Sequence, residues 1–385
     1  MLRQKGIEIQ VVAMRRPAAD TPFSAAQKKL QQGVLYLLPV QWLQLLFSHL
    51  YFFLLRPFCF GQTFLYLISR PYATHKVRIK TVFHFGEGVY MAYLVRKRPF
   101  REFHAHFVDR AATIALVASR LLDKPYSLSV HAGADIFVDP VLLPEKILGA
   151  RHIATCTRYN KTHIETLINR DLTSKMTHVN HGLELTKYEL GVMNGRQKRP
   201  LILAVGQLAE RKGFYQLIQA CHHLKTLGYA FTCRIIGRGP QQQELHDLID
   251  QLSLEDTVIL CGALPHDEVI NWYRSATLFV LPCIQAKDGN LDGIPNVLAE
   301  AMAMQLPVIS TTVSAIPELI EDEVTGLLVA PADVTALSNA MRRLLDEPEL
   351  RTNLGQQARQ FITNTFDIEC NVYQFAATLW PEWVN

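Results

Sequence analysis

The sequence predicts an α/β protein built of two doubly wound domains that face each other across a cleft. Its 385 residues exceed what one hydrophobic core usually serves. Short β-type runs alternate with longer helical patterns, which is typical of parallel sheets covered by helices on both faces. The alternation restarts after a polar segment near residue 190. Ligands in such sheets bind beyond the carboxyl ends of the strands.

The first half is expected to contain five strands and a well-defined helix. The helix is RAATIALVASRLL (110–122), whose apolar residues recur at helical spacing and whose N-cap is expected to be Asp109. The expected strands are IEIQVVAM (7–14), TVFHF (81–85), EFHAHF (102–107), YSLSVHA (126–132) and MTHVNHG (176–182).

Domain boundaries follow from composition. We expect an N-terminal domain over 1–190 and a linker over 191–200, where the chain is polar, carries Asn-Gly and ends in proline. A C-terminal domain would span 201–365, and a helix in 366–385 would return to the N-terminal domain. The strands expected in the second half are LILAVG (201–206), FTCRIIG (231–237), TVILCG (257–262), TLFVLP (277–282), LPVIST (306–311) and GLLVAP (326–331).

Charge and cysteine content narrow the class of protein. Lys and Arg number 39 against 35 Asp and Glu, a formal charge of +4 that does not call for nucleic acid, and we expect no such partner. The seven cysteines are scattered without a CxxC pair, which argues for a reducing compartment. The N-terminus lacks the pattern of a signal peptide, so we expect a cytoplasmic protein.

Residues 31–55 carry no formal charge and approach the length of a bilayer-spanning helix. Pro39, Gln41, Gln44 and His49 argue against a simple span, because they would be costly or disruptive within a lone hydrophobic helix. Three interpretations stay open: a buried helical hairpin, which we favour, a segment on a membrane surface, and a true span.

The stretch DGIPNVLAEAMA (292–303) predicts a helix start that binds an anion. Pro295 suits the first helical turn, and Gly293 permits close backbone approach. The free amides near Asn296 and Val297 would suit a phosphate. Glu300 falls outside the apolar stripe, where it can accept hydrogen bonds from sugar hydroxyls without being desolvated in a core. An ordinary capped helix with a solvated glutamate is an equal alternative.

Three further motifs follow predicted strands. Lys212 in LAVGQLAERKGF is placed at a helix start, where it would neutralise a phosphate. RIIGRGP carries two glycines, for which a tight turn is the simpler interpretation. His131 in SLSVHAGADIF faces the predicted cleft, although a lone histidine is more often structural. Structural roles are expected still more strongly for His104, His106, His181, His222 and His223. None has metal-ligand spacing, so we predict no metal.

The order of these motifs resembles a known family. GQLAERKGF, IIGRGP, LDGIPNVLAEAMAMQLPVIST and IPELIEDEVTGLLVAPAD look like the nucleotide-sugar half of glycosyltransferase family 4, retaining enzymes of the GT-B fold. This match covers essentially all of 200–345. The first half matches less tightly, through FHAHFVDRAATIALVASRLL, SVHAGADIF and HVNHGLELTKY. The variant DGNLDGIPNVLAEAMA is similar to the branch for colanic acid and other exopolysaccharide synthesis.

The resemblance implies roles for individual residues. Two groups would catalyse: His131 lies beside the reacting sugar, and Asp292 takes hydroxyls of that sugar. Lys212 and the amides near Asn296 and Val297 would hold the diphosphate, with Glu300 on the ribose. The remaining donor contacts would come from Gly206, Gln207, Arg211, Gly237, Arg238, Leu264 and Gly293, with Arg238 and Leu264 lining the base pocket. Charge stabilisation of this kind needs neither metal nor cofactor.

Three departures from the family pattern stand out. Asp292 replaces the usual glutamate, and Gln207 replaces the usual arginine, so that Arg211 or Arg238 would supply the cation. The chain also begins at what resembles the end of the first family helix, so we expect further coding sequence upstream of Met1 and an incomplete acceptor-side domain in 1–190.

The resulting expectation is a retaining hexosyltransferase. It would move a sugar from a nucleoside diphosphate onto a lipid-linked or polysaccharide acceptor in exopolysaccharide or cell-surface glycan synthesis, at the inner face of the plasma membrane. The uncharged stretch 31–55 and the nearby residues Arg15, Arg16, Lys28 and Lys29 would suit docking there. The alternatives are a nucleotide-sugar-binding or assembly protein without turnover and a GT-B epimerase.

Overall fold

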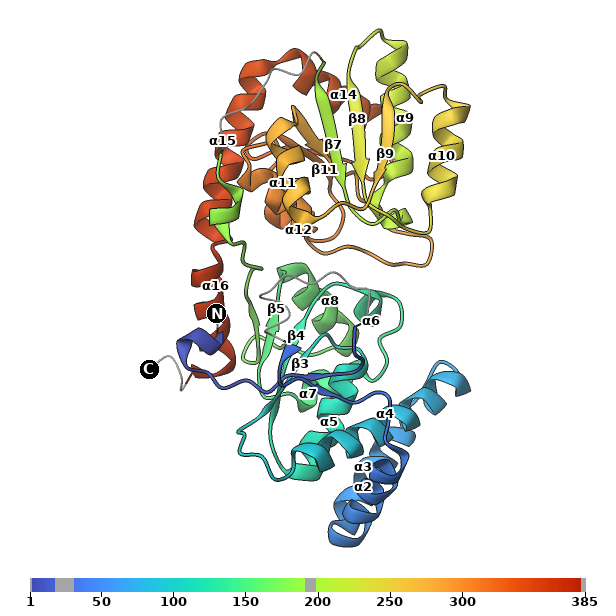
Figure 1. The fold of residues 1–385 in the computed structure, drawn as a ribbon, viewed down its shortest axis with the longest axis vertical. Coiled ribbons are helices and arrows are strands. Elements are labelled where there is room, and N and C mark those ends of the chain that lie inside the picture. Colours follow the sequence, from blue (N-terminus) through green and yellow to red (C-terminus); the bar gives the residue numbers. More distant parts are fainter. Residues whose placement is uncertain (1, 18–30, 191–198, 382–385) are drawn as a thin grey trace.

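The computed structural model describes residues 2–17, 31–190 and 199–381, and consists of two α/β halves, one above the other in Figure 1. Most of the predicted linker, 191–198, lies outside the described residues, as do Lys28 and Lys29. Each half has its own hydrophobic core around a parallel sheet. The predicted α/β architecture with parallel sheets is confirmed.

The C-terminal half contains a six-stranded parallel sheet in the order β12-β11-β10-β7-β8-β9. The order reverses between β7 (Leu201–Val205) and β10 (Leu278–Val280), which makes the sheet doubly wound and creates a crevice at the carboxyl ends of these two strands. All six strands predicted in this half are present; the others are β8 (Thr232–Ile236), β9 (Val258–Gly262), β11 (Val308–Thr311) and β12 (Leu327–Val329). The helices are α9 (Phe214–Thr226), α10 (Gln242–Gln251), α11 (His266–Ser275), α12 (Asn296–Ala303), α13 (Ile316–Leu319), α14 (Val334–Asp346) and α15 (Pro348–Thr365).

The N-terminal half contains a four-stranded parallel sheet in the order β3-β4-β5-β6. Its strands are β3 (Phe103–His106), β4 (Tyr126–Val130), β5 (Ile153–Thr155) and β6 (Met176–His178), of which β5 is not among the predicted strands. The crossover helices are α5 (Arg110–Leu122), α6 (Ala134–Phe137), α7 (Leu143–Gly149) and α8 (Arg158–Ile168). Asp109 caps α5 as predicted, because its carboxylate accepts a hydrogen bond from the amide of Ala111.

The last helix, α16 (Ile368–Leu379), packs on the N-terminal sheet. The rings of Phe375 and Trp380 lie 5.7 and 5.8 Å from the ring of His104 on β3. His104 in turn bonds the hydroxyls of Ser127 and Ser129 on β4. The helix therefore covers the sheet face that carries these polar side chains, and Figure 1 shows α15 and α16 running along one side of both halves.

Two of the predicted strands are wrong in whole or in part. TVFHF belongs to α4 (His75–Val95), which is capped by Thr74 and buries Thr81, Phe85 and Val89 at four-residue spacing. The β-branched and aromatic residues favoured a strand, but packing against α5 decides the helix. In IEIQVVAM only β1 (Val12–Ala13) is a strand, and it pairs in parallel with β2 (Leu35–Tyr36) outside both large sheets.

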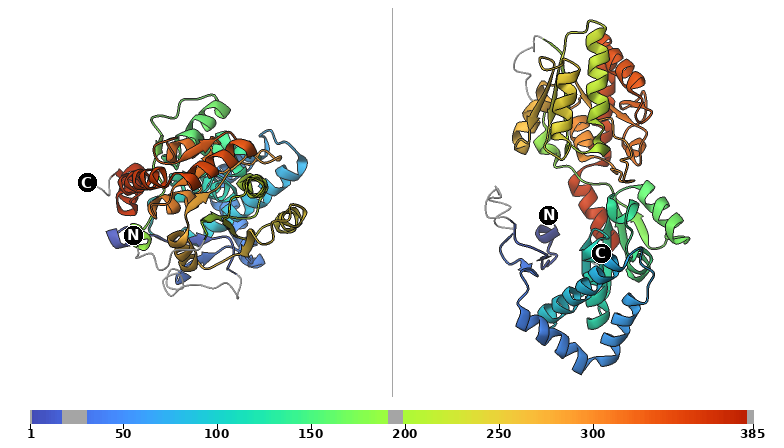
Figure 2. Two further views of the ribbon diagram at one scale, coloured as in Figure 1. Left: turned by 90° about the horizontal axis from the view of Figure 1, so that it is seen from above. Right: turned by 90° about the vertical axis from the view of Figure 1, so that its right-hand side faces the viewer.

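Residues 31–55 do not form a buried helical hairpin. They contain β2 and α2 (Trp42–Leu55), which is followed directly by α3 (Pro57–Ile68). Each helix buries only two side chains, and Trp42 and Phe58 are 78% and 85% exposed. No single helix in the described ranges is long and apolar enough to cross a membrane, although α2 and α3 together, bent by 113°, meet the length and composition criteria. Figure 2 shows these helices and α4 projecting at the end farthest from the C-terminal half.

Three short 3₁₀ helices complete the described secondary structure: Leu2–Lys5, Leu185–Tyr188 and Glu210–Lys212.

The two halves contact each other through specific polar groups. The carboxylate of Glu318 on α13 accepts hydrogen bonds from the amides of Arg158 and Tyr159 at the start of α8, at 2.8 and 2.7 Å. A carboxylate at a helix N-terminus is favourable, because it satisfies free amides and the helix dipole. Gly293 approaches Ala132 so closely that a Cβ atom on the glycine would lie 2.7 Å from the Cβ of Ala132. The crevice of the C-terminal sheet therefore opens toward the strand ends of the N-terminal sheet.

Candidate active site between the two halves

The loops after β7 and β10 bring two cations and an acid together at the crevice. Nζ of Lys212 lies 2.9 Å from Oδ2 of Asp292, and Nε of Arg211 lies 3.1 Å from Oδ1 of the same carboxylate. Lys212 is buried and sits directly before α9, whose N-cap is Gly213 with φ of 70°. Glycine is required there, because any Cβ would collide with the carbonyl oxygen of Pro282. The predicted position of Lys212 at a helix start is confirmed.

The structure shows what Gln207 does at the position where the resemblance implies an arginine. Its side-chain oxygen accepts a hydrogen bond from Nη2 of Arg211 at 2.9 Å. Arg211 is therefore held beside Asp292 from two sides, and its guanidinium supplies a second cation next to Lys212. Of the two possible replacements, Arg211 and Arg238, the geometry favours Arg211.

The loop after β8 packs backbone against backbone with the loop after β7. The amide of Leu208 donates to the carbonyl of Arg238 at 3.0 Å, and a Cβ on Gly237 would collide with the carbonyl of Gly206. The glycines of RIIGRGP thus allow close approach of two loops rather than only a tight turn. Gly206 also lies beside the side chain of Lys212, whose Cδ and Cε would be 3.6 Å from a Cβ at this position.

Arg238 and Leu264 lie on the β9 side of this loop. Nε of Arg238 would be 3.8 Å from a Cβ on Gly262, the last residue of β9, and Leu264 follows as a partly buried residue packed on the core. The side chain of Arg238 and the residue Leu264 thus both lie near the carboxyl end of β9.

Helix α12 begins at Asn296, one residue later than the predicted position of Pro295 in its first turn. Pro295 is the N-cap, and its carbonyl accepts from the amide of Leu298. The amides of Asn296 and Val297 have no hydrogen-bond acceptor within the part of the chain that the structure describes. They form a free helix start next to Asp292, which suits an anion.

Glu300 is buried in α12. The expectation that its carboxylate lies outside the core and stays solvated is therefore wrong. Glu300 is 9% exposed, and Oε2 accepts a hydrogen bond from the hydroxyl of Tyr273 at 2.9 Å. Nε2 of His266 lies 3.6 Å from Oε1, and the hydroxyl of Tyr188 lies 3.2 Å from the same imidazole nitrogen. Burial, and next the charge of Glu300, raises the pKa of Tyr273 well above its ordinary value. Tyr273 and His266 use only part of the hydrogen-bonding capacity of the Glu300 carboxylate, which can therefore accept further hydrogen bonds.

His131 follows β4 and lies in a row of imidazoles. Nδ1 of His131 is 2.9 Å from Nε2 of His181, and Nδ1 of His181 is 3.1 Å from Oδ1 of Asn296. Asn296 Oδ1 only accepts, so His181 Nδ1 donates to it and, in neutral rings, His131 Nδ1 donates to His181. His131 Nε2 is then a lone pair, and this buried atom has no partner among the described residues. Burial, with smaller contributions from neighbouring histidines, lowers the pKa of His131 to about 3.

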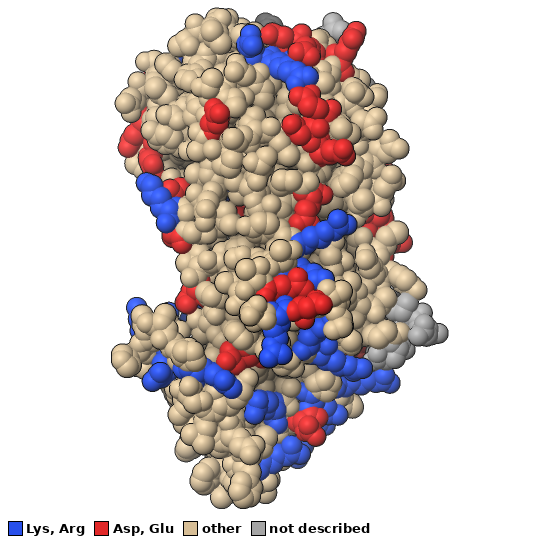
Figure 3. Space-filling view, turned by 180° about the vertical axis from the view of Figure 1, so that it is seen from behind, with Lys and Arg blue, Asp and Glu red and all other residues tan. Residues whose placement is uncertain are grey.

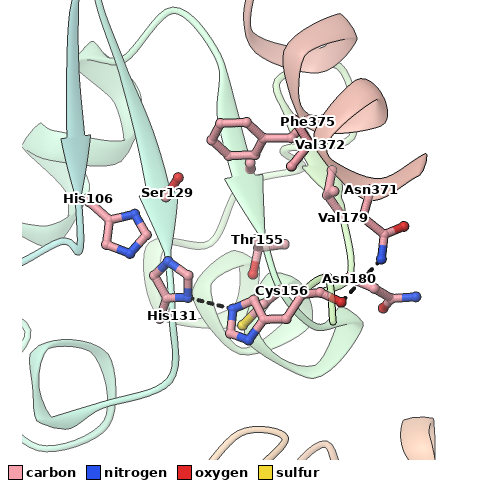
Figure 4. Close-up of a pocket in the computed structure, with 13 residues that line it drawn as sticks. His106, Ser129, His131, Thr155, Cys156, Val179, Asn180, Asn371, Val372 and Phe375 are labelled. Carbon is pink, nitrogen blue, oxygen red and sulfur yellow. Dashed lines mark hydrogen bonds between the residues drawn. The ribbon is translucent and has the colours of Figure 1, made fainter. Parts of the chain in front are cut away.

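A pocket of about 170 Å³ adjoins these histidines (Figure 4). It is bounded on one side by strand ends of the N-terminal sheet and on the other by α16, which presents Phe375 and Asn371 to it. The Nδ2 of Asn371 donates to the carbonyl of His181 at 3.1 Å. The lining residues are His106, Ser129, His131, Ala154, Thr155, Cys156, Val179, Asn180, His181, Gly182, Asn371, Val372 and Phe375.

Ligand atoms of His131, Cys156 and His181 lie within 4.8 Å of one another, close enough to bind a metal ion. Two observations weaken this possibility. The two imidazoles already share a hydrogen bond, and burial raises the pKa of the Cys156 thiol to about 11, which disfavours the thiolate. A thiolate rather than a thiol ligates metals.

The structure brings many of the predicted site residues together. Gln207, Arg211, Lys212 and Asp292 form one contact group, and Asn296 joins His131 through His181. Among the described residues, Glu300, Arg238 and Leu264 make no hydrogen bond or ion pair with Gln207, Arg211, Lys212 or Asp292. Sequence reasoning favours a structural role for His181, although its position at the carboxyl end of a predicted strand, as for His131, is a usable signal. It did not single out Tyr273, His266 or Tyr188, whose contacts to Glu300 depend on tertiary packing.

Comparison with known proteins shows what this chain is similar to in sequence and in fold. Residues 192–361 match the family described as glycosyl transferases group 1. The chain is 37% identical over 188 residues to the putative colanic acid biosynthesis glycosyltransferase WcaL of Escherichia coli. The match covers 48% of this chain and 46% of WcaL. The chain is 40% identical over 163 residues to the amylovoran biosynthesis glycosyltransferase AmsK of Erwinia amylovora, covering 42% and 40%. These matches span less than half the length of either relative.

The fold is shared with a solved structure of HepE from Anabaena in complex with UDP-glucose. The TM-score is 0.66 at 18% identity, and the alignment covers 76% of this chain and 82% of HepE. The two halves with their parallel sheets have the GT-B fold.

Proposed function

We propose that this chain, whose residues 192–361 match the group 1 glycosyltransferases and which has the GT-B fold, transfers a sugar from a nucleoside-diphosphate sugar to a glycan or lipid-linked acceptor. The observation that carries the proposal is the group of Lys212, Arg211 and Asp292 beside the free start of α12. Cations and unpaired helix amides at a strand-order reversal form a site for a diphosphate.

The donor would occupy the crevice in a defined direction. Lys212, Arg211 and the amides of Asn296 and Val297 would hold the diphosphate and stabilise its charge as the sugar departs. Glu300 would accept hydrogen bonds from the ribose, and Arg238 with the backbone near Leu264 would line the base pocket. HepE binds UDP-glucose, which supports a nucleotide sugar as the donor here.

His131 and Asp292 would act on the transferred sugar. The lone pair on Nε2 of His131 would accept a hydrogen bond from a sugar hydroxyl, and Asp292, once its cations turn to the diphosphate, would accept from another. Both groups would also stabilise an oxocarbenium-like centre in the transition state. We assign the chain to the retaining enzymes of family 4, by its motif resemblance. Determining the anomeric configuration of the product by NMR tests this, and an inverted product would refute it.

The relatives support an acceptor in exopolysaccharide or cell-surface glycan synthesis. WcaL and AmsK are named for colanic acid and amylovoran biosynthesis, and each is similar to this chain over part of its length. The enzyme would work in the cytoplasm at the inner face of the plasma membrane, where lipid-linked acceptors are carried. Cell fractionation tests the location, and recovery of the protein only outside the cytoplasm and inner membrane would refute it.

Transfer would require no metal ion or other cofactor, because Lys212, Arg211 and helix amides supply the positive charge. Dialysis against EDTA followed by elemental analysis and an activity assay tests this. If EDTA removes one equivalent of zinc and the activity with it, the enzyme does need a metal. The variant Cys156→Ala then locates that metal. If untreated Cys156→Ala keeps its zinc and its activity, the metal lies elsewhere, and if it lacks both, the metal lies in the group of His131, Cys156 and His181.

The deciding experiment ranks UDP-, GDP- and other nucleotide sugars by thermal shift, with Lys212→Ala and Glu300→Ala as site variants. A donor that stabilises only the unmodified protein would then be offered with candidate acceptors, and release of nucleoside diphosphate measured. Acceptor-dependent release supports the proposal. Binding without release would favour a nucleotide-sugar-binding or assembly protein, and interconversion of the donor without acceptor would favour an epimerase. Equal stabilisation of all three proteins would remove the site assignment.

A further inference from the structure

The far end of the N-terminal half carries an extensive exposed apolar surface. On α2 it includes Trp42, Leu46, Phe47, Phe53 and Leu54. The surface continues over α3 and the first turns of α4, with Phe58, Leu65, Ile79, Val82 and Phe83. Monomeric proteins rarely leave large contiguous apolar patches in water, so such a surface marks an interaction site.

Charge on the same segment is of one sign. Residues 31–86 contain no Asp or Glu, whereas they contain five Lys and Arg residues. Arg56 and Arg70 are engaged, with the carbonyl of Leu121 and with Glu145 respectively. Lys76, Arg78 and Lys80 are exposed at the start of α4. Seen from behind in Figure 3, Lys and Arg are frequent over the lower half of the molecule, whereas Asp and Glu gather over the upper half.

Basic and apolar side chains share one face of α4. Lys76, Lys80 and Phe83 follow each other at four- and three-residue spacing, so that they lie along one side of the helix, and Ile79 is on the same side. A helix with aromatic and aliphatic residues bordered by lysines lies in the plane of a membrane interface. Trp42, at the exposed first position of α2, is a side chain that favours the headgroup level of a bilayer.

We propose that α2, α3 and the start of α4 form a docking surface for an anionic lipid bilayer, with the apolar side chains inserted into one leaflet and Lys76 and Lys80 on the headgroups. The inference deepens the proposed function, on which it rests for its biological sense, because it holds the enzyme where a lipid-linked acceptor is carried. A second copy of this chain fits less well, since a symmetric contact would bring the like charges of two α4 helices together. An anionic leaflet attracts them.

Vesicle binding of the full chain tests the proposal. Sedimentation would compare phosphatidylcholine vesicles with vesicles that contain about 30% phosphatidylglycerol, an anionic lipid. We expect binding to the anionic vesicles, stronger than to neutral ones and weakened by salt, with a blue shift of emission that disappears in Trp42→Phe. No binding to either composition would overturn the proposal.

Matched variants locate the surface. Leu46→Glu with Phe53→Glu is expected to lower the vesicle partition constant about tenfold or more, because two inserted side chains become charged. Leu227→Glu is the control, since Leu227 is 62% exposed, as Leu46 is 65% exposed, but lies in the C-terminal half. Lys76→Gln with Lys80→Gln is expected to weaken only binding to anionic vesicles, and Lys187→Gln with Lys225→Gln is its control.

Three further measurements distinguish lipid docking from misfolding of the variants and from self-association. Thermal unfolding and donor binding of the variants should match the unmodified protein, because the changed side chains are exposed and distant from Lys212. A failure of vesicle binding with intact donor binding therefore sinks this inference and leaves the proposed transfer standing. Sedimentation equilibrium that shows a dimer, broken by Leu46→Glu with Phe53→Glu and indifferent to vesicles, would assign the surface to a second copy instead.

Discussion

The carboxylate of Asp292 forms ion pairs with both cations of the crevice: Nζ of Lys212 lies 2.9 Å from its Oδ2, and Nε of Arg211 lies 3.1 Å from its Oδ1. In the proposed complex the cations would turn to a diphosphate and the acid to a sugar. Donor binding then exchanges one set of ion pairs for another, so that the carboxylate holds the cations in place beforehand and competes with the ligand for them.

Lys212→Ala is predicted to weaken UDP or GDP binding about 10- to 100-fold, the worth of a lost hydrogen bond from a charged group to a phosphate. Isothermal titration of the nucleotide that binds the unmodified protein measures the change. Lys287→Ala is the matched control, because Lys287 is an exposed lysine on the neighbouring loop. Equal affinities for the two variants would remove Lys212 from the donor site.

Asp292→Asn is predicted to separate nucleotide binding from transfer. Without the negative charge, Lys212 and Arg211 lose their competitor, so the free nucleoside diphosphate should bind a few-fold more tightly. Sugar transfer should fall about 100-fold, since the charged acceptor of the sugar hydroxyl and its stabilising field are lost. Titration with nucleotide and an initial-rate assay test the two effects. A variant that loses both equally would show that Asp292 serves mainly to position the cations.

Some of this site was predictable from sequence, because local signals and tertiary requirements agree there. Lys212 lies in the loop after a fully buried strand, Leu201–Val205. It precedes Gly213, which is glycine because the backbone has a positive φ there. Burial of Glu300 was not predictable in this way, since it depends on Tyr273 from another helix.

In the first half, long-range packing explains what the sequence does not reveal about the histidines, whereas local signals explain the error at α4. His131 and His181 are 50 residues apart and meet only because β4 and β6 are both neighbours of β5. Helix α4 was misassigned over 81–85 because its β-branched and aromatic residues resemble a strand, whereas its Thr74 cap and four-residue burial spacing, visible in the sequence, indicate the helix. The outer face of α2 is apolar like a core helix, and composition alone does not distinguish the two.

Stability is predicted to fall between pH 6.5 and pH 4 because neutral histidines are buried. Burial lowers the pKa of His104 to about 4, and an unfolded histidine titrates near 6.5, so the unfolded chain binds the proton first as the pH falls. The stabilisation is therefore complete above 6.5 and is lost toward 4. His104 alone would cost about 2.5 kcal/mol at pH 4.5.

Urea unfolding at pH 7.5 and 4.5 measures this loss. His104→Gln should reduce the difference in free energy of unfolding between the two pH values, whereas His223→Gln, which changes an exposed histidine on α9, should leave it unchanged. An identical pH dependence in both variants would show that His104 is not protonated on unfolding in this range.

Gly293→Ala is predicted to hold the two halves apart. The new Cβ would lie 2.7 Å from the Cβ of Ala132, closer than carbon atoms approach, and Ala132 follows His131 directly. The proposed sugar-binding groups, His131 and Asp292, would then separate, so that transfer falls about tenfold or more while nucleotide binding, which we assign to the C-terminal half, persists. Small-angle scattering should show a larger radius of gyration. Gly61→Ala is the matched control, because a Cβ there meets nothing within 4 Å. Unchanged scattering and unchanged transfer in Gly293→Ala would mean that the contact between Gly293 and Ala132 does not set the spacing of the halves during turnover.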